Sequence, residues 1–220
     1  MNTRRIAVLG ADRTGKTRLA CEIAAHLAEQ GVCAIAVPAV LPEWCEAHGR
    51  TPRPEEQLAI AQEQEHRVEL AAREHAFVIA DTTALMLAVH AGMGSADEDL
   101  RRFALESQQA YDATLVTGLD LPWVSGKPER DLAQRREDVD TLVRSLLQAA
   151  QVHFQVVYGS GTQRLQSALV ALVAAGVLPA ETAGRARDGD TRRAWHWNCE
   201  KCSDPACEHR LFTQLRAARG

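Results

Sequence analysis

The sequence predicts an α/β fold in which a five-stranded parallel sheet lies between two layers of helices. Short apolar runs alternate with helical patterns along most of the 220 residues, as expected when crossover helices connect parallel strands. Acidic or turn-forming residues follow the predicted strands, where such sheets bind their ligands. They are Gly10, Pro38, Asp81, Asp120 and Gly159. We therefore expect one composite site at the carboxyl edge of the sheet.

The first half of the chain supplies three strands and three helices. Apolar runs predict strands over Arg4–Leu9, Val32–Val37 and His75–Asp81. Helical spacing of apolar residues predicts helices over Arg18–Leu27, over Val40–His48, and from about Thr51 to Glu74. Gly31 and Gly49 are natural stops for the first two helices.

The second half completes the alternation. Strands are predicted over Ala113–Thr117 and Phe154–Tyr158. Helices are predicted over Thr82–Met93, Asp97–Ala110 and Thr162–Ala174. A segment dense in charge, Glu129–Asp140, lies between the last two strands.

The connection between the first strand and the first helix matches the phosphate-binding pattern G-x-x-x-x-G-K-[ST] without a mismatch. Its residues are Gly10, Ala11, Asp12, Arg13, Thr14, Gly15, Lys16 and Thr17. The glycines allow backbone N–H groups to face phosphate oxygens at the start of a helix. Lys16 is expected to reach the β- and γ-phosphates, and the Thr17 hydroxyl to bind Mg²⁺. We therefore expect a P-loop NTPase fold that binds ATP and Mg²⁺; the alternative is a glycine turn without a nucleotide.

Asp81 ends a strand of four apolar residues, which is typical of the carboxylate on the magnesium side of a phosphate-loop protein. In the alternative interpretation Asp81 caps the following helix, and both roles are compatible. The charged segment also has two interpretations. Arg130, Arg135 and Arg136 supply cations from a lid over the transferring phosphate, or they lie on a solvated helix face.

The composition, with 46% hydrophobic and 25% charged residues, is that of an ordinary globular protein. The net charge of −4 gives no reason to expect a nucleic-acid partner, and no apolar run reaches the length of a membrane span. The chain enters its first strand without a cleavable apolar segment, so we expect a cytoplasmic protein. Cys21, Cys33 and Cys45 are interpreted as small buried side chains.

Cysteine and histidine concentrate near the end of the chain, where the spacing C-x₂-C-x₄-C-x-H predicts a structural zinc site. Its expected ligands are Cys199, Cys202, Cys207 and His209, with His196 as an alternative fourth ligand. A redox dithiol and cysteines without a shared role are the other interpretations. The sequence thus predicts a P-loop domain over residues 1–176, a linker over 177–194 and a zinc-binding tail over 195–220. The tail is a candidate contact for a homo-oligomer or a protein partner.

The combined motifs resemble the ribosylnicotinamide kinase domain of NadR-type proteins, within the P-loop nucleoside-kinase-like and AAA-type ATP-binding proteins. The resemblance covers about residues 4–174. It rests on Gly10–Thr17, Leu41–Cys45, Gln57 and Gln64, Ile79–Met86, and Thr117–Trp123 with Arg130 and Asp131. The zinc-like tail lies outside it.

This resemblance implies transfer of the ATP γ-phosphoryl group to the ribose 5′-hydroxyl of nicotinamide riboside, giving nicotinamide mononucleotide in NAD metabolism. It assigns Asp81 to magnesium binding or to accepting the hydroxyl proton, and Arg130 with Arg135 or Arg136 to the lid. The implied substrate contacts are Glu43, Gln64 and Trp123.

The chain departs from the family pattern after the second strand. Ala39 stands where the family usually carries a glutamate, and Pro42 stands where it carries an arginine. Glu43, one helical turn further on, is a candidate substitute; a changed substrate and lost kinase activity are the alternatives. The second hypothesis is therefore a nucleotide-binding ATPase or switch whose tail binds a partner. A nucleic-acid-associated protein is the third, and the acidic net charge disfavours it.

Overall fold

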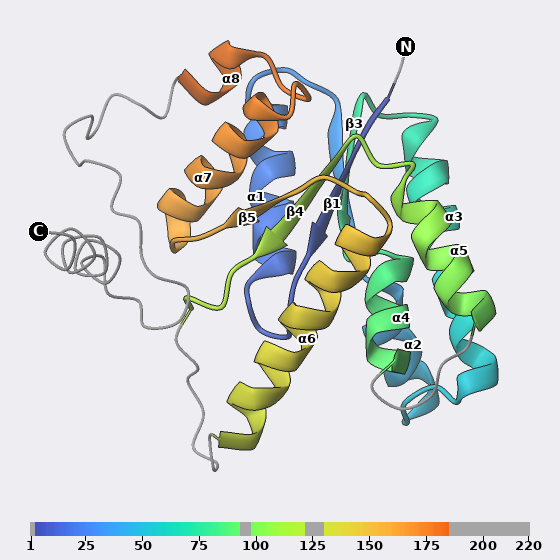
Figure 1. Ribbon diagram of the computed structural model, residues 1–220. Helices are drawn as coiled ribbons and strands as arrows, with labels where there is room; N and C mark the ends of the chain where they lie inside the picture. Colours follow the sequence, from blue (N-terminus) through green and yellow to red (C-terminus); the bar gives the residue numbers. More distant parts are fainter. Residues whose placement is uncertain (1–2, 93–97, 122–129, 185–220) are drawn as a thin grey trace, which may run out of the picture. The chain divides into compact units, whose positions relative to one another are not determined.

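Five parallel strands form a single sheet in the computed structural model, which describes residues 3–92, 98–121 and 130–184. The strands are β1 (Arg4–Leu9), β2 (Ala34–Val37), β3 (Phe77–Asp81), β4 (Ala113–Thr117) and β5 (Phe154–Val157). Their order across the sheet is β2-β3-β1-β4-β5, which places β1 at the centre (Figure 1). The predicted three-layer α/β fold is confirmed.

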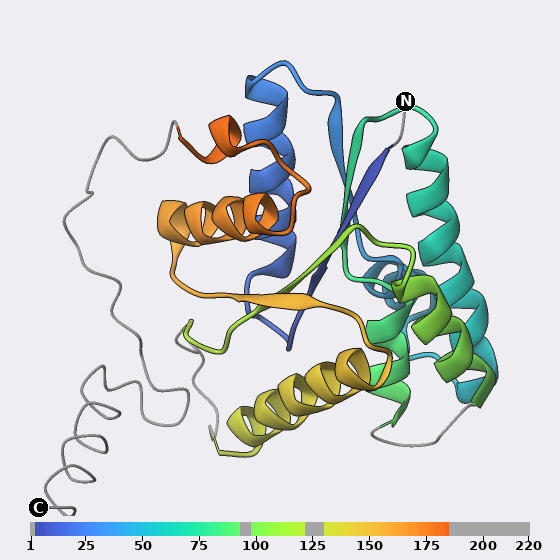
Figure 2. The same ribbon diagram turned by 45° about the horizontal axis from the view of Figure 1, so that its top comes forward.

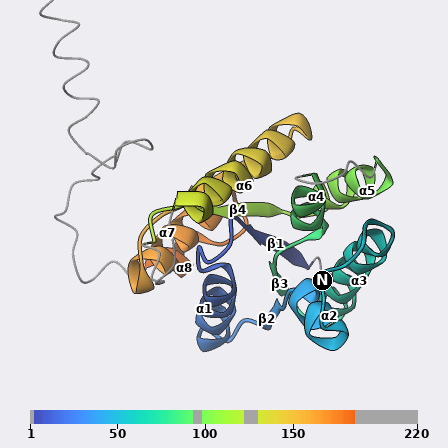
Figure 3. The ribbon, with the colours of Figure 1, turned by 90° about the horizontal axis from the view of Figure 1, so that it is seen from below.

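Helices cover both faces of this sheet. They are α1 (Lys16–Glu29), α2 (Val40–His48), α3 (Pro54–Ala72), α4 (Ala84–Gly92), α5 (Glu98–Gln108), α6 (Arg130–Ala149), α7 (Gly161–Ala174) and α8 (Ala180–Gly184). Seen along the layers, α1 and α7 lie on one side of the strands, and α3, α4, α5 and α6 lie on the other (Figure 3). The neighbouring helices α1 and α7 pack against each other (Figure 2).

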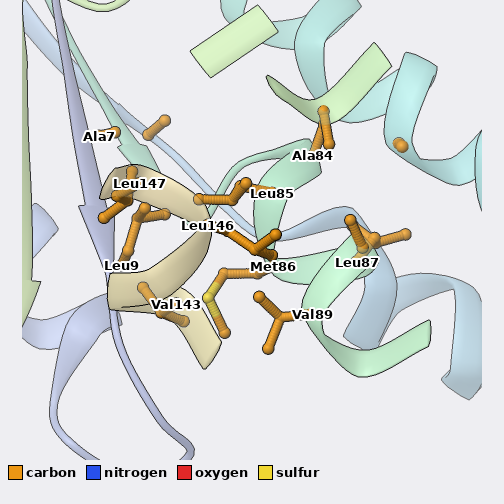
Figure 4. Close-up of a cluster of buried hydrophobic side chains, with 14 of the residues drawn as sticks. Ala7, Leu9, Ala84, Leu85, Met86, Leu87, Val89, Val143, Leu146 and Leu147 are labelled. Atoms are coloured by element: carbon orange, nitrogen blue, oxygen red, sulfur yellow. The ribbon is translucent and has the colours of Figure 1, made fainter. Parts of the chain in front are cut away.

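The central strand β1 is apolar because both of its faces are buried. Ile6 and Val8 pack in the core shared with α1 and α7. Ala7 and Leu9 pack in the opposite core, where Figure 4 shows Leu9 near side chains of α4 and α6. A strand buried on both sides reads as a continuous apolar run, which is why its limits could be predicted.

Local signals set several helix ends. Gly49 ends α2 in the left-handed conformation, with φ of 65°. Pro54 occupies the first turn of α3, where its missing N–H costs no hydrogen bond. The Glu56 carboxylate accepts the N–H of Arg53 at 2.8 Å and so satisfies a donor at this terminus.

The main differences from the sequence-based expectations concern the start of the fourth helix, the charged segment and two cysteines. The fourth helix begins at Ala84, because Thr82 has a positive φ of 79° that cannot continue into a right-handed helix. The charged segment singled out in the sequence forms only the first part of α6, and the helix continues to Ala149. Cys21 and Cys33 are exposed, so their interpretation as buried side chains was wrong.

Among the helices of the described residues, none combines the length and the apolar character that crossing a lipid bilayer requires.

Candidate functional site

The phosphate-binding loop connects the central strand to α1, as its pattern predicts. Gly10 has φ of 139° and Gly15 has φ of 83°, values that a residue with a side chain rarely adopts. A Cβ atom on Gly10 would also lie 2.2 Å from Oγ1 of Thr117, so only glycine fits. Helix α1 starts immediately afterwards at Lys16. The loop therefore lies at a helix N-terminus, where unpaired N–H groups favour an anion.

Two buried threonine hydroxyls brace the back of this loop. The Thr14 side chain is fully buried and donates to the carbonyl of Ala11 at 2.7 Å. Its oxygen also lies 2.6 Å from the hydroxyl of Thr117, which donates either to Thr14 or to the carbonyl of Leu9, 3.1 Å away. The end of β4 thus fixes the loop to the end of β1.

Lys16 lies against the loop that precedes it. Its ammonium group donates to the Ala11 carbonyl at 2.8 Å. Burial lowers the pKa of Lys16, and the charge of Arg136 adds to this decrease, while Asp12 and Asp81 oppose it. Positive groups from the loop and from α6 therefore lie close together, which favours binding of an anion nearby.

Asp81 ends β3 beside the loop, because the parallel register pairs it with Val8 of β1. The side chain is 5% exposed and its carboxylate accepts a hydrogen bond from Thr17. Its Oδ1 atom has no hydrogen-bond partner among the described residues. Burial raises the pKa of Asp81, although the Thr17 hydrogen bond and the charge of Lys16 oppose the increase.

Thr17 and Asp81 fit a magnesium ion. A hydroxyl and a carboxylate are oxygen ligands of the kind that Mg²⁺ prefers. A buried carboxylate oxygen without a partner is costly, and a cation would satisfy it. The residues predicted to bind magnesium are therefore adjacent, and their chemistry suits the ion.

The alternative interpretation made Asp81 the cap of α4. Other residues accept the hydrogen bonds of the first N–H groups of this helix. The Thr83 hydroxyl accepts the N–H of Leu85 at 3.2 Å, and the Glu65 carboxylate accepts the N–H of Ala84 at 2.8 Å. Among the described contacts, the Asp81 carboxylate is directed to Thr17 instead.

The predicted substrate residues near β2 already have partners. Gln64 is fully buried; its amide accepts the N–H of Val40 at 2.8 Å and donates to the carbonyl of Pro38 at 3.3 Å. Glu43 is mostly exposed and pairs with Arg67 at 2.6 Å. Gln64 therefore holds the β2–α2 connection in place, and Glu43 joins α2 to α3.

The predicted lid arginines lie on α6. Arg136 is half-buried, and its charge affects the pKa of both Lys16 and Arg164, so it lies near the loop. Arg135 is exposed. Arg130 is the first residue of the helix, and its side chain is outside the described part of the structure. Within the loop itself, Asp12 and Arg13 are exposed.

Several other predicted residues fall outside the described part of the chain. They are Trp123, His196 and the four expected zinc ligands Cys199, Cys202, Cys207 and His209. Within residues 3–92, 98–121 and 130–184, no group of three or more His, Cys, Asp or Glu side chains could hold a metal ion. The zinc site therefore stays a prediction.

Arg164 of α7 is a residue of the site that the sequence-based reasoning missed. It is 4% exposed and donates hydrogen bonds to the carbonyls of Thr14 and Gly159 and to the carboxylate of Asp120. Its position carries a sequence signal, because Arg164 falls on the helix stripe that includes Ala168 and Leu172, both buried. An arginine on a buried stripe needs partners.

Comparisons with known proteins agree with this geometry. The sequence profile of the AAA domain family (AAA_28) matches residues 5–164. NadR protein in complex with NR has the same fold, with a TM-score of 0.61 and 16% identity over 79% of this chain and 50% of that one. NadR protein in complex with NAD and AMP-PNP gives a TM-score of 0.62 and 16% identity, over 80% and 50% of the two chains.

Thymidylate kinase from Ehrlichia chaffeensis also shares the fold, with a TM-score of 0.56 and 15% identity over 79% of this chain and 99% of that one. The chain spans half the length of the NadR chains. No curated protein matches it by sequence. Because the family profile covers more than half of its residues, the chain belongs to the AAA domain family.

Proposed function

We propose that the chain is an ATP-dependent kinase of a small nucleoside-like metabolite, with nicotinamide riboside as the best candidate. The pairing of Thr17 with Asp81, beside Lys16, carries this proposal. A phosphate loop by itself supports any nucleotide-binding activity. A buried carboxylate with an unpaired oxygen adds a magnesium ligand or a proton acceptor next to it. The fold shared with NadR in complex with NR supports the choice of acceptor.

In this mechanism the loop binds the triphosphate of ATP. Lys16 exchanges the carbonyl of Ala11 for oxygens of the β- and γ-phosphates. Thr17 and Asp81 would hold Mg²⁺, which supplies positive charge to the phosphate oxygens. Arg136 adds charge from α6, in keeping with its effect on Lys16.

Phosphoryl transfer then requires an acceptor hydroxyl in line with the γ-phosphate. The hydroxyl oxygen forms the new bond to phosphorus, the bond from phosphorus to the departing ADP oxygen breaks, and the hydroxyl proton is lost. Burial raises the pKa of Asp81, which makes it a better proton acceptor than an ordinary aspartate. Asp81 therefore serves as the magnesium ligand or as the base for the acceptor.

A panel of nucleosides tests this proposal. Purified protein is incubated with ATP, Mg²⁺ and nicotinamide riboside, thymidine or another nucleoside, and 5′-monophosphates are measured by mass spectrometry. Nicotinamide mononucleotide is the expected product, and Lys16→Ala and Asp81→Asn are expected to abolish it. If the wild-type protein binds ATP but forms no monophosphate with any acceptor, the kinase proposal is wrong.

The second candidate function is an ATPase or nucleotide switch without a small-molecule acceptor. The pairing of Glu43 with Arg67 favours it, because that carboxylate was the candidate substitute for the glutamate replaced by Ala39. This function predicts ATP binding that is lost in Lys16→Ala, hydrolysis that no nucleoside changes, and a protein contact that depends on Cys199.

A further inference from the structure

Arg164 links three segments at the carboxyl edge of the sheet. Its guanidinium donates through Nη1 to the carbonyl of Thr14 in the phosphate loop, and through Nη2 to Asp120 after β4. Its Nε donates to the carbonyl of Gly159, in the connection from β5 to α7, at 2.7 Å. One buried side chain thus holds segments that are far apart in the sequence.

Asp120 completes this arrangement from the other side. One carboxylate oxygen pairs with Arg164, and the other accepts the N–H of Gly159 at 2.6 Å. Both backbone groups of Gly159 are therefore bound by a single ion pair. Gly159 has φ of 101°, a conformation that glycine adopts without strain. Hydrogen bonds to charged groups are stronger than neutral ones, so the pair fixes this connection firmly.

The contact with Thr14 determines the direction of a peptide group in the phosphate loop. The peptide between Thr14 and Gly15 is trans and planar, so its N–H points away from its carbonyl. With the carbonyl bound to Arg164, the N–H of Gly15 is directed to the opposite side. The Thr14 side chain is held independently by Thr117. Backbone N–H groups oriented in this way bind phosphate.

We propose that Arg164 and Asp120 form a positioning pair that couples the phosphate loop to the β5–α7 connection and sets the affinity for a nucleoside triphosphate. The inference rests on the proposed function only in taking this triphosphate as the ligand. Arg164 donates to the loop's backbone, so its loss weakens nucleotide binding.

Three substitutions separate the parts of this pair. Arg164→Met keeps the apolar stem and removes every donor. Arg164→Lys keeps the charge but lacks the planar fork that reaches three acceptors. Asp120→Asn keeps an acceptor and removes the negative charge. Arg102→Met is the matched control, because Arg102 forms an exposed ion pair with Asp99 on α5.

Calorimetric titration with MgATP, without an acceptor, measures the affinity of each variant, and thermal unfolding shows whether it folds. Arg164→Met is expected to raise Kd by at least about tenfold, with smaller increases for Arg164→Lys and Asp120→Asn and none for the control. In the phosphorylation assay, KM for ATP is expected to rise in parallel with Kd.

The outcomes distinguish this inference from a purely structural role. Unchanged Kd in a folded Arg164 variant, or a fall in kcat with unchanged KM, would overturn it. If Arg164→Met does not fold, the Kd values of Arg164→Lys and Asp120→Asn decide the inference: increased values support it and unchanged values overturn it. Wild type that binds ATP but phosphorylates nothing refutes the kinase proposal, and the Kd comparison still decides the role of Arg164. Wild type that binds no ATP refutes both.

Discussion

At the scale of single residues, Asp81 concentrates the chemistry of the site. The side chain is almost fully buried, yet its Oδ1 atom lacks a partner among the described residues. Folding without a ligand therefore carries a cost that a bound cation would remove. The cost is tolerated where the site binds a ligand, which is the physical reason to assign Asp81 a function.

Substituting Asp81 separates activity from stability. Asp81→Asn keeps the size of the side chain and removes the charge, so kcat for phosphoryl transfer is expected to fall by at least about a hundredfold. The free energy of unfolding without magnesium is expected to stay equal or increase, because no buried carboxylate remains to be ionised. Steady-state kinetics and urea unfolding measure the two effects.

The same substitution changes the pH dependence of stability. Burial raises the pKa of Asp81 in the folded state above its unfolded value, so the folded state binds the proton more tightly. The contribution of Asp81 to the free energy of unfolding is present at low pH and is lost as pH rises through the raised pKa. Asp81→Asn removes this loss, so without magnesium the stability difference from wild type should grow as pH rises through the raised pKa of Asp81. A constant difference would contradict the argument.

Lys16, Thr17 and Asp81 could be predicted because the pattern that identifies them is local in the sequence. Gln64 and Arg164 show the limit of that approach. The partners of Gln64 are backbone groups of the β2–α2 connection. Those of Arg164 include Thr14 and Asp120, which are distant in the sequence. Such contacts depend on how strands are ordered in the sheet, which periodicity does not reveal.

At the scale of elements, the half-buried carboxylate of Glu65 joins α3 to the start of α4. Glu65 accepts the N–H of Ala84 and the hydroxyl of Tyr111, each at 2.8 Å. Thr83 accepts the next N–H and donates to Gln108 at 2.7 Å. These contacts begin α4 two residues later than periodicity indicated, and Asp81 remains the last residue of β3. The sequence predicted that a helix forms here, but not which residues accept the hydrogen bonds of its first N–H groups.

Glu65 offers a test of this junction. Glu65→Ala leaves the N–H of Ala84 without its acceptor and should lower the free energy of unfolding by about 1–3 kcal/mol. Glu65→Gln keeps an acceptor and removes a half-buried charge, so it should cost much less at neutral pH. Urea unfolding of both variants gives the comparison, and equal losses would show that the hydrogen bond to Ala84 is unimportant.

The pH dependence provides a second measurement. Burial raises the pKa of Glu65 despite the hydrogen bonds from Ala84 and Tyr111. Wild type should therefore lose stability as pH rises through this raised pKa, and Glu65→Gln should lose less over the same range.

At the scale of the whole molecule, strand order brings the site together. The neighbours of β1 are β3 and β4, so Asp81 and Thr117 flank the phosphate loop although they come from different parts of the chain. The sequence predicted five parallel strands, with limits within two residues of those observed, but the order of the strands comes from the structure. Beyond α7, Val177 and Leu178 pack in the core with α1. The predicted domain limits at residues 176 and 194 stay predictions.

The predicted zinc site is tested on the full chain. Purified protein should contain about one zinc ion per chain, and Cys199→Ser should remove most of it. Cys21→Ser is the matched control, because Cys21 is exposed on α1 and lies outside the predicted ligand set. Elemental analysis after gel filtration gives the content. Equal zinc in the two variants would exclude Cys199 as a ligand.

The central claim is that the γ-phosphoryl group of ATP passes to an acceptor hydroxyl and not to water. ATP labelled with ³²P at the γ-phosphate, incubated with the protein, Mg²⁺ and nicotinamide riboside, follows that group directly. We expect the label in nicotinamide mononucleotide, at a rate that depends on Asp81. Label released only as inorganic phosphate, at the same rate with and without any nucleoside acceptor, would contradict the claim.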